Sequence, residues 1–184
     1  MKGKFLNKYR IDSARAVWWD YGKKGGYFVT ICTQNRKHFF GECKNGKMQL
    51  STMGAIVQGF WYDIPKHFAH VVLGEFQVMP DHIHGILILQ SNAPISEKNG
   101  SDSTGKDVQK FYSSISPKAG SVPVILRSFK SICTKHINLI FPDLNFGWQE
   151  RFHDHIIRDD GEYERIANYI INNPLKWGIG KSSK

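Results

Sequence analysis

The most informative segment of the chain reads Val78-Met79-Pro80-Asp81-His82-Ile83-His84-Gly85-Ile86-Leu87-Ile88-Leu89. Proline presets one turn dihedral and aspartate caps the amides that follow, so residues 79–81 predict a tight turn. Residues 82–89 then end in an almost continuous apolar run. Such a run is too apolar for the exposed edge of a sheet, so we expect a strand at the centre of the sheet.

The segments on either side of this turn predict further strands and helices. Residues 27–33 are rich in β-branched and aromatic side chains, which is typical of a buried strand. Residues 34–50 contain turn residues, including Asn45-Gly46, and indicate a hairpin or a loop excursion. Apolar spacing, caps and prolines predict the remaining elements. These are a helix from 51 to about 64 stopped by Pro65, strands at 71–78 and 148–158 (the latter with its approach loop), a helix at 122–140, and a helix capped by Asp159 and ended by Pro174.

This order of elements predicts an α+β fold. The first six elements match the ferredoxin-like, RRM-like arrangement, in which two helices cover one face of an antiparallel sheet, and a C-terminal helix follows. We expect one domain at residues 25–177, with a basic N-terminal arm at 1–24 and a basic tail at 178–184. Residues 91–121 are rich in serine, glycine and charged residues, which predicts a mobile insertion loop.

Composition narrows the class of protein. The net charge of +9 suits a polyanionic partner, but it does not separate DNA from RNA or an acidic membrane, and a solvated basic surface is the alternative. The three cysteines form no CxxC pair, which argues against a disulfide framework or a cysteine–zinc site. Neither a signal peptide nor an apolar run of ~20 residues is apparent, so we expect a cytoplasmic protein without a membrane partner.

The sharpest local feature is the pair His82 and His84. Alternate residues of a strand share a face, so both imidazoles would point the same way while Ile83 points into the other layer. Two histidines on one side can hold a metal ion, and Asp81 in the preceding turn can support them. The alternative is one buried histidine and one surface histidine, which a bare HxH pattern leaves open.

A second feature lies on the predicted C-terminal helix. Tyr169 and Asn173 are four residues apart, so they lie one above the other on a helix. The phenol could attack phosphorus, and the amide oxygen could reach the metal held by the histidines. Alternatively, Tyr169 is an aromatic core anchor and Asn173 caps the helix before Pro174.

Several segments together resemble the REP-associated tyrosine transposases, which belong to the single-tyrosine HUH transposases. The matching segments are residues 78–85, the run Arg127-Ser128-Phe129-Lys130-Ser131, residues 148–158 and the run Tyr169-Ile170-Ile171-Asn172-Asn173-Pro174, with a similar opening at 25–33. The resemblance rests on their joint order and spacing and covers most of residues 25–177, outside the insertion.

This resemblance implies a reaction. Tyr169 would be the nucleophile that cuts and rejoins single-stranded DNA through a 5′-phosphotyrosine, and His82, His84 and Asn173 would hold Mg²⁺ or Mn²⁺. These three ligands carry no negative charge, so phosphate and water would supply the oxygen ligands that such ions prefer. The expected partner is single-stranded DNA with a hairpin such as a REP palindrome, bound by a monomer or homodimer in the bacterial nucleoid.

Other residues have weaker expected roles. His155 lies in a matching segment and is either a support for the metal ligands or an ordinary strand residue. DNA contacts are expected from basic residues of the second long helix, and base stacking from two tryptophans of the N-terminal arm. These residues are Arg127, Lys130, Lys135, Trp18 and Trp19.

A non-catalytic binder of single-stranded nucleic acid on the same fold, such as a domesticated transposase, is the alternative function. That class would carry aromatic side chains on the exposed sheet face, where this sequence has its histidines. A triple-histidine nucleotide hydrolase would need a third histidine in place of Ile86, and a cyclic phosphodiesterase would need two HxT motifs, which the chain lacks.

Overall fold

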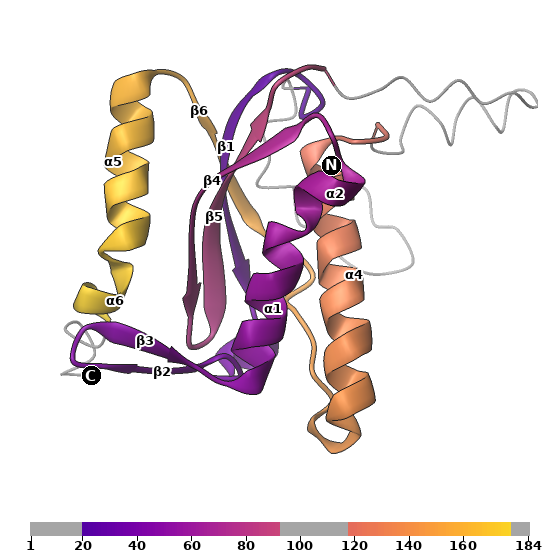
Figure 1. Cartoon of the computed structure of the whole chain (residues 1–184), viewed down its shortest axis with the longest axis vertical. Coiled ribbons are helices and arrows are strands. Elements are labelled where there is room, and N and C mark those ends of the chain that lie inside the picture. The colour runs from indigo at the N-terminus through magenta and orange to yellow at the C-terminus, as the bar shows by residue number, and fades with distance from the viewer. Residues whose placement is uncertain (1–19, 93–117, 178–184) are drawn as a thin grey trace, which may run out of the picture.

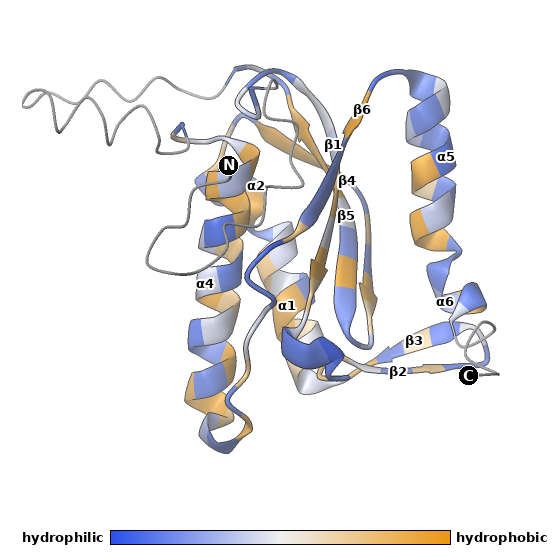
Figure 2. Ribbon diagram, turned by 180° about the vertical axis from the view of Figure 1, so that it is seen from behind, coloured by the Kyte–Doolittle hydropathy of each residue, from blue (hydrophilic) through white to orange (hydrophobic). Residues whose placement is uncertain are grey.

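The structure, a computed structural model, describes residues 20–92 and 118–177 of the 184-residue chain (Figure 1). Its centre is an antiparallel sheet in the order β4-β5-β1-β6. These strands are β1 (Gly25–Cys32), β4 (Val71–Met79), β5 (His82–Leu89) and β6 (His153–Ile157). Helices α1 (Thr52–Tyr62) and α4 (Val122–Ile140) cover one face, and α5 (Asp160–Ile171) covers the other (Figures 1 and 2). The predicted α+β, ferredoxin-like fold with an added C-terminal helix is confirmed.

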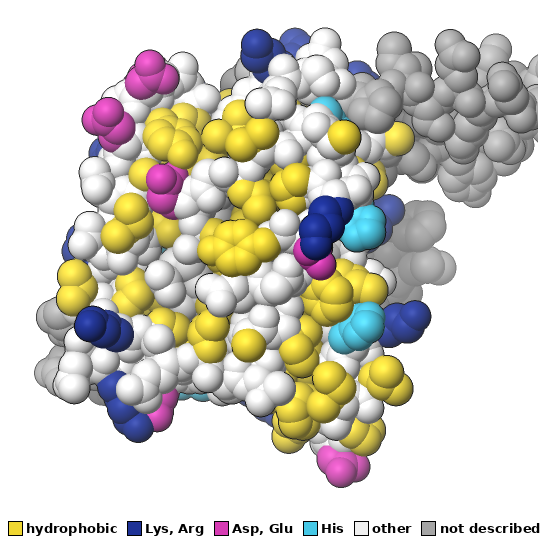
Figure 3. Space-filling model, viewed as in Figure 1, with side chains coloured by type: hydrophobic (Ala, Val, Ile, Leu, Met, Phe, Trp, Pro, Cys, Tyr) yellow, Lys and Arg dark blue, Asp and Glu magenta, His cyan; other side chains and the backbone are white. Residues whose placement is uncertain are grey.

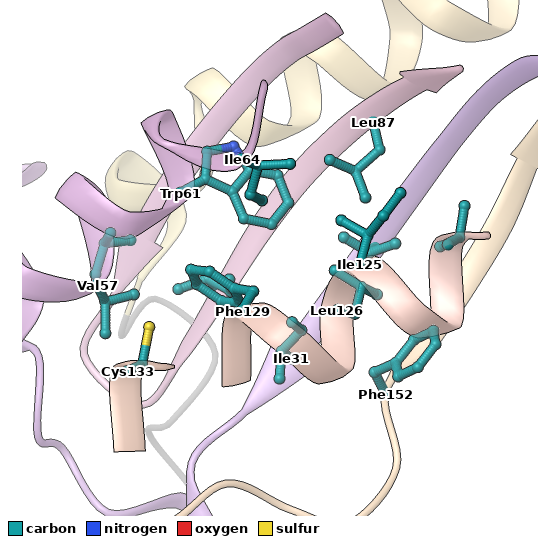
Figure 4. Close-up of a cluster of buried hydrophobic side chains, with 14 of the residues drawn as sticks. Ile31, Val57, Trp61, Ile64, Leu87, Ile125, Leu126, Phe129, Cys133 and Phe152 are labelled. Carbon is teal, nitrogen blue, oxygen red and sulfur yellow. The ribbon is translucent and has the colours of Figure 1, made fainter. Parts of the chain in front are cut away.

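The main core lies between the sheet and helices α1 and α4. Ile83 is fully buried there, and the Trp61 ring of α1 packs on the backbone of β5 at Gly85, whose ideal Cβ would stand 2.3 Å from Trp61 Cζ2. Figure 4 shows this cluster, with Phe129 and Cys133 of α4 beside Trp61 and Val57 of α1. Because β5 lies between β4 and β1, its apolar run is central, as predicted.

A smaller cluster joins α5 to the opposite face of the sheet. Ile166, Ala167 and Ile170 of the helix pack against Ile86 of β5. Asp159 caps the helix by accepting a hydrogen bond from the Glu162 amide, and the acidic first turn suits the positive helix N-terminus. This second cluster is small, so α5 is attached to the sheet by one apolar stripe.

The predicted hairpin forms a separate two-stranded sheet of β2 (Gly41–Lys44) and β3 (Lys47–Leu50). Asn45 and Gly46 both have positive φ, 51° and 71°, as the tight turn of a two-residue hairpin requires. The turn lies against the short helix α6 (Asn173–Lys176), since an ideal Cβ at Gly46 would stand 2.5 Å from Leu175 Cδ2. The hairpin therefore contacts the end of the C-terminal helical segment (Figure 1).

Two predicted helices end shortly before the prolines that were expected to stop them, α1 at Tyr62 and α5 at Ile171. The sequence did not predict that Pro65 and Pro174 each lie in the first turn of a new short helix, α2 (Ile64–His67) and α6. Proline suits a first turn because its fixed φ is helical and its missing N–H is not needed there. Helix α5 ends earlier, and Asn172, rather than Asn173, occupies its C-cap.

The two remaining described elements are short 3-10 turns at Gln34–Arg36 and Pro142–Leu144. Most of the loop predicted at 91–121, together with the terminal segments 1–19 and 178–184, lies outside the described residues. Within the described part of the chain, no helix is both long and apolar enough to cross a membrane.

Candidate active site around a histidine pair

His82 and His84 point to the same face of β5, toward α5. Their Nε2 atoms lie 3.0 Å apart, and the two side chains are almost fully buried. The alternation of the strand produces this pairing, since Ile83 between them points into the main core. The pair thus sits on the central strand, where the sheet holds both rings firmly.

The outer nitrogens of both rings have partners. His82 Nδ1 lies 2.6 Å from Asp81 Oδ1, and Asp81 Oδ2 in turn lies 3.0 Å from Arg36 Nε. His84 Nδ1 lies 2.8 Å from Thr30 Oγ1 on the neighbouring strand β1. Contacts at Nδ1 fix the orientation of each ring and leave both Nε2 atoms facing one another.

Burial and charge determine the protonation of this cluster. Burial, together with the nearby charges of His82 and Arg36, lowers the pKa of His84 to about 3, against a smaller opposing effect of Asp81. Burial acts to raise the pKa of Asp81, but its hydrogen bond to His82 and the charges of His82 and Arg36 outweigh this and hold it below its usual value. Near neutral pH, His84 is therefore a neutral imidazole and Asp81 an ionised carboxylate.

The histidine pair fits a divalent metal ion. Two ligands at roughly 2.1 Å from an octahedral ion, at right angles to each other, would be about 3.0 Å apart, which matches the separation of the two Nε2 atoms. A neutral imidazole is also the form that binds metal. Among the described residues no group of three or more His, Cys, Asp or Glu side chains is suited to a metal, so further ligands would have to be amide, phosphate or water oxygens.

Tyr169 lies beside this pair. Its hydroxyl is 3.4 Å from His84 Nε2, and its ring meets Phe28 edge-on with centroids 6.1 Å apart. The side chain is 43% exposed, so the hydroxyl is reachable from solvent although the histidines below it are buried. Helix α5 brings this residue to the histidines across 85 positions of sequence.

A polar tether also fixes the position of α5. The Tyr163 hydroxyl donates to Glu75 Oε2 at 2.7 Å, at the irregularity in β4 where the pairing with β5 shifts register. Burial and the neighbouring Glu75 carboxylate raise the pKa of Tyr163 to about 12, so its phenol stays protonated as a donor. This hydrogen bond ties the first half of α5 to the edge strand β4.

Asn173, the third predicted ligand, begins α6 and is half-buried. The break at Asn172 means that Tyr169 and Asn173 do not share one continuous helix. Within the part of the chain that is described, no hydrogen bond joins the Asn173 amide to either imidazole. The structure thus brings together His82, His84 and Tyr169, and leaves Asn173 at the adjoining helix start.

A pocket of about 580 Å³ opens next to Tyr169, between α5 and the sheet. His155 lies on its wall and pairs with Glu162 at 2.8 Å, rather than contacting the histidine pair. The lining residues are Phe28, His155, Arg165, Ile166, Asn168, Tyr169, Asn172 and Lys176. The sequence did not predict the roles of Arg165, Asn168, Asn172 and Lys176. The offsets of three and seven from Arg165 place Asn168 and Asn172 on one helical face with it, whereas Lys176 joins the lining only through the start of α6.

The predicted DNA contacts on α4 lie elsewhere. Arg127, Lys130 and Lys135 belong to the helix that covers the face of the sheet opposite to α5 (Figures 1 and 2). Lys130 Nζ donates to the carbonyl oxygens of Gln149 and Glu150, which ties α4 to the segment before β6. Trp18 and Trp19 lie outside the described residues.

The chain is similar in sequence to one known protein and in fold to a solved transposase structure. No family model matches the chain. An uncharacterized protein of Haemophilus influenzae is 32% identical over 165 residues, covering 90% of this chain and 88% of the relative. The structure of a REP-associated tyrosine transposase bound to a REP hairpin superposes with a TM-score of 0.52 at 19% identity, covering 91% of this chain and 75% of that one. The protein therefore has a fold like that of the transposase, and it belongs to the same family as the Haemophilus influenzae protein.

Proposed function

We propose that this protein is a metal-dependent tyrosine transposase that cuts and rejoins single-stranded DNA, with Tyr169 as its nucleophile. The observation that carries the proposal is the 3.4 Å separation between the Tyr169 hydroxyl and His84 Nε2. The Nε2 atom of His82 lies 3.0 Å from the same His84 nitrogen. The positive net charge and the fold likeness to a transposase bound to a DNA hairpin support DNA as the partner.

His82 and His84 would hold Mg²⁺ or Mn²⁺, with Asn173 as a third ligand once its amide turns toward them. The bound ion would supply Lewis acidity to a phosphate oxygen. Asp81 and Thr30 fix the orientation of the two imidazole rings through their contacts with the Nδ1 atoms. The chain at 25–177 would act as one domain, with a hairpin DNA as substrate.

Tyr169 performs the covalent step. Its Oη forms a bond to phosphorus, the phosphorus–O3′ bond breaks, and the phenol proton is lost. The products are a 5′-phosphotyrosine and a strand ending in a 3′-hydroxyl. Attack by a 3′-hydroxyl on the phosphotyrosine reverses these changes, so the strand is resealed and the phenol is released without external energy.

A second function, binding of single-stranded DNA without cleavage, is favoured by one observation. Phe28 of β1 lies half-buried on the same sheet face as the histidines and lines a pocket, and an aromatic side chain on the open sheet face is what such a binder uses. A domesticated transposase with the same fold would behave in this way.

The two functions are separated by trapping the covalent intermediate. The full chain is incubated with a labelled single-stranded hairpin DNA and Mn²⁺, and a denaturing gel is scanned for a protein–DNA adduct. We expect an adduct with the native chain, none with Tyr169→Phe, and none in excess chelator. The control is Tyr62→Phe, since Tyr62 is another exposed tyrosine, on α1 across the sheet. An adduct that persists in Tyr169→Phe would contradict the assignment.

A further inference from the structure

The pocket beside Tyr169 has no role in the chemistry described so far. It lies over β1 and β6, at the register where Phe28 pairs with His155, and α5 forms its other side. Its volume of about 580 Å³ is in the range of pockets that bind small organic ligands. Because Tyr169 is part of its lining, any group in this pocket lies next to the proposed nucleophile.

The floor of the pocket is aromatic. Phe28 is half-buried, with its ring 5.5 Å from the His84 ring and edge-on to Tyr169 at 6.1 Å. These contacts fix the ring from below and from one side, and the pocket opens above it. A fixed aromatic ring in an open pocket is the usual platform for stacking an unpaired base.

The rim of the pocket is cationic. Arg165 and Lys176 lie at opposite ends of the lining face, on α5 and α6, and both are exposed. Glu162 offsets part of this charge through its pairs with His155 and Arg165. Lys176 has no ion pair within the described residues. Figure 3 shows acidic side chains over the first turn of α5 and basic ones near the β2–β3 hairpin and α6.

Two amides lie between these cations. Asn172 Nδ2 donates to the Asn168 carbonyl oxygen, and among the described residues the Asn172 side-chain oxygen and the Asn168 side-chain amide make no further hydrogen bond. Amides offer a donor and an acceptor, and they can pair with the edge of an unstacked base. A base on Phe28 would present its edge to this helix face.

We propose that this pocket binds one unpaired nucleotide next to the bond that Tyr169 attacks, with its base on Phe28 and its flanking phosphates near Arg165 and Lys176. Asn168 and Asn172 determine which base is preferred. This inference rests on the proposed function for the identity of the strand, but the binding itself needs no cleavage.

The test is a binding experiment in excess chelator, where no cutting occurs. The probe is a fluorescent DNA hairpin with single-stranded tails, in which one abasic nucleotide is placed in turn at each tail position. We expect one position at which base removal weakens binding of the native chain about tenfold. In Phe28→Leu that loss should shrink to about twofold, because the stacking platform is already gone. The matched control is Phe60→Leu, a half-buried phenylalanine of α1 on the other face.

The charged rim is tested with the same probe. Arg165→Gln and Lys176→Gln should each weaken binding several-fold and reduce the salt dependence of log K by about 0.7 per lost phosphate contact. Lys66→Gln, at an exposed lysine of α2 outside the pocket lining, should leave both unchanged. Circular dichroism checks that each variant is folded. If Phe28→Leu unfolds, the surface variants Arg165→Gln and Lys176→Gln still test whether the pocket binds DNA.

The outcomes separate this inference from the proposed function. A Tyr169 adduct together with an abasic profile that Phe28→Leu does not change overturns the pocket assignment and leaves the transposase function standing. No adduct, but a sensitive position that disappears in Phe28→Leu, supports the pocket in a protein that binds without cutting. A native chain with no sensitive position, or rim variants that bind like the native chain, also overturns the inference.

Discussion

His84 illustrates how burial prepares a residue for metal binding. The sheet removes its ring from water, which lowers the pKa of His84 to about 3, and Thr30 at Nδ1 fixes the direction of the remaining lone pair. A histidine on the surface would be partly protonated near neutral pH and would have to lose a proton before binding. In the folded chain the buried His84 ring is already neutral, so no proton has to leave before a metal ion binds.

This depressed pKa predicts a pH dependence of stability. Because the unfolded chain binds a proton at His84 near its ordinary pKa of 6.5 and the folded chain does so only near 3, the contribution to stability is present above 6.5 and is lost as pH falls toward 3. Metal-free native protein should therefore lose unfolding free energy faster than His84→Gln across this range. Denaturant unfolding at several pH values measures the difference, and parallel pH curves would contradict the prediction.

Asp81 has a separate, supporting role. Its carboxylate accepts from His82 Nδ1 and is held by Arg36, so Asp81→Asn should misorient His82 or weaken its basicity. We expect a loss of about 10- to 100-fold in Mn²⁺ affinity, measured by calorimetry. Asp63→Asn is the control, since Asp63 forms an ion pair with exposed Lys66 near the end of α1, away from the histidine pair. Equal Mn²⁺ affinity in Asp81→Asn and the native chain would exclude this role.

At the scale of the elements, the site depends on how β5 is placed between two layers. Trp61 of α1 packs directly on the backbone of β5 at Gly85, immediately after His84, so one helix supports the histidine strand from behind. On the other face, α5 is held by the small cluster around Ile86 and by the Tyr163–Glu75 hydrogen bond.

Two glycine substitutions test the close packing behind the site. In Gly85→Ala the new Cβ would stand 2.3 Å from Trp61 Cζ2, so the ring or strand must shift, at a cost of about 1–3 kcal/mol in unfolding free energy. In Gly59→Ala the Cβ meets nothing within 4 Å, and alanine in a helix interior should stabilise the chain by up to ~1 kcal/mol. Denaturant unfolding measures both, and equal effects of the same sign would contradict the packing described.

The short helices show where local reasoning was incomplete. Helices α1 and α5 end before Pro65 and Pro174, as expected, but each proline also begins a new helical turn. Proline is common both just after a helix and in the first turn of the next one, and tertiary contacts decide whether a new helix begins there. For Pro174 the contact is the β2–β3 turn, where Gly46 lies against Leu175 of α6.

At the scale of the whole molecule, the sequence predicted the architecture and half of the site. Alternation and apolar spacing were enough for the strand order, because a buried central strand and two amphipathic helices leave few arrangements open. They also placed His82 and His84 on one face. The position of Asn173 and the pocket around Phe28 and Arg165 were not predictable, since both depend on where α5 ends and how it docks on the sheet.

The structural contacts of the basic residues were also not predictable from the sequence. Lys130, a predicted DNA contact, donates to the backbone carbonyl oxygen of Gln149, nineteen residues away in the chain. Net charge reports the total and says nothing of its distribution. The cations that line the pocket with Tyr169 are Arg165 of α5 and Lys176 of α6.

The central claim is that Tyr169 becomes covalently attached to DNA, and mass spectrometry of the trapped adduct tests it most directly. Native protein is incubated with single-stranded hairpin DNA and Mn²⁺, denatured, and digested with protease and nuclease. The account predicts that the peptide retaining a nucleotide remnant is modified at Tyr169. A remnant on any other residue, such as Tyr163 six residues earlier on α5, would contradict the account. So would the absence of a covalent remnant under conditions in which the DNA is cut.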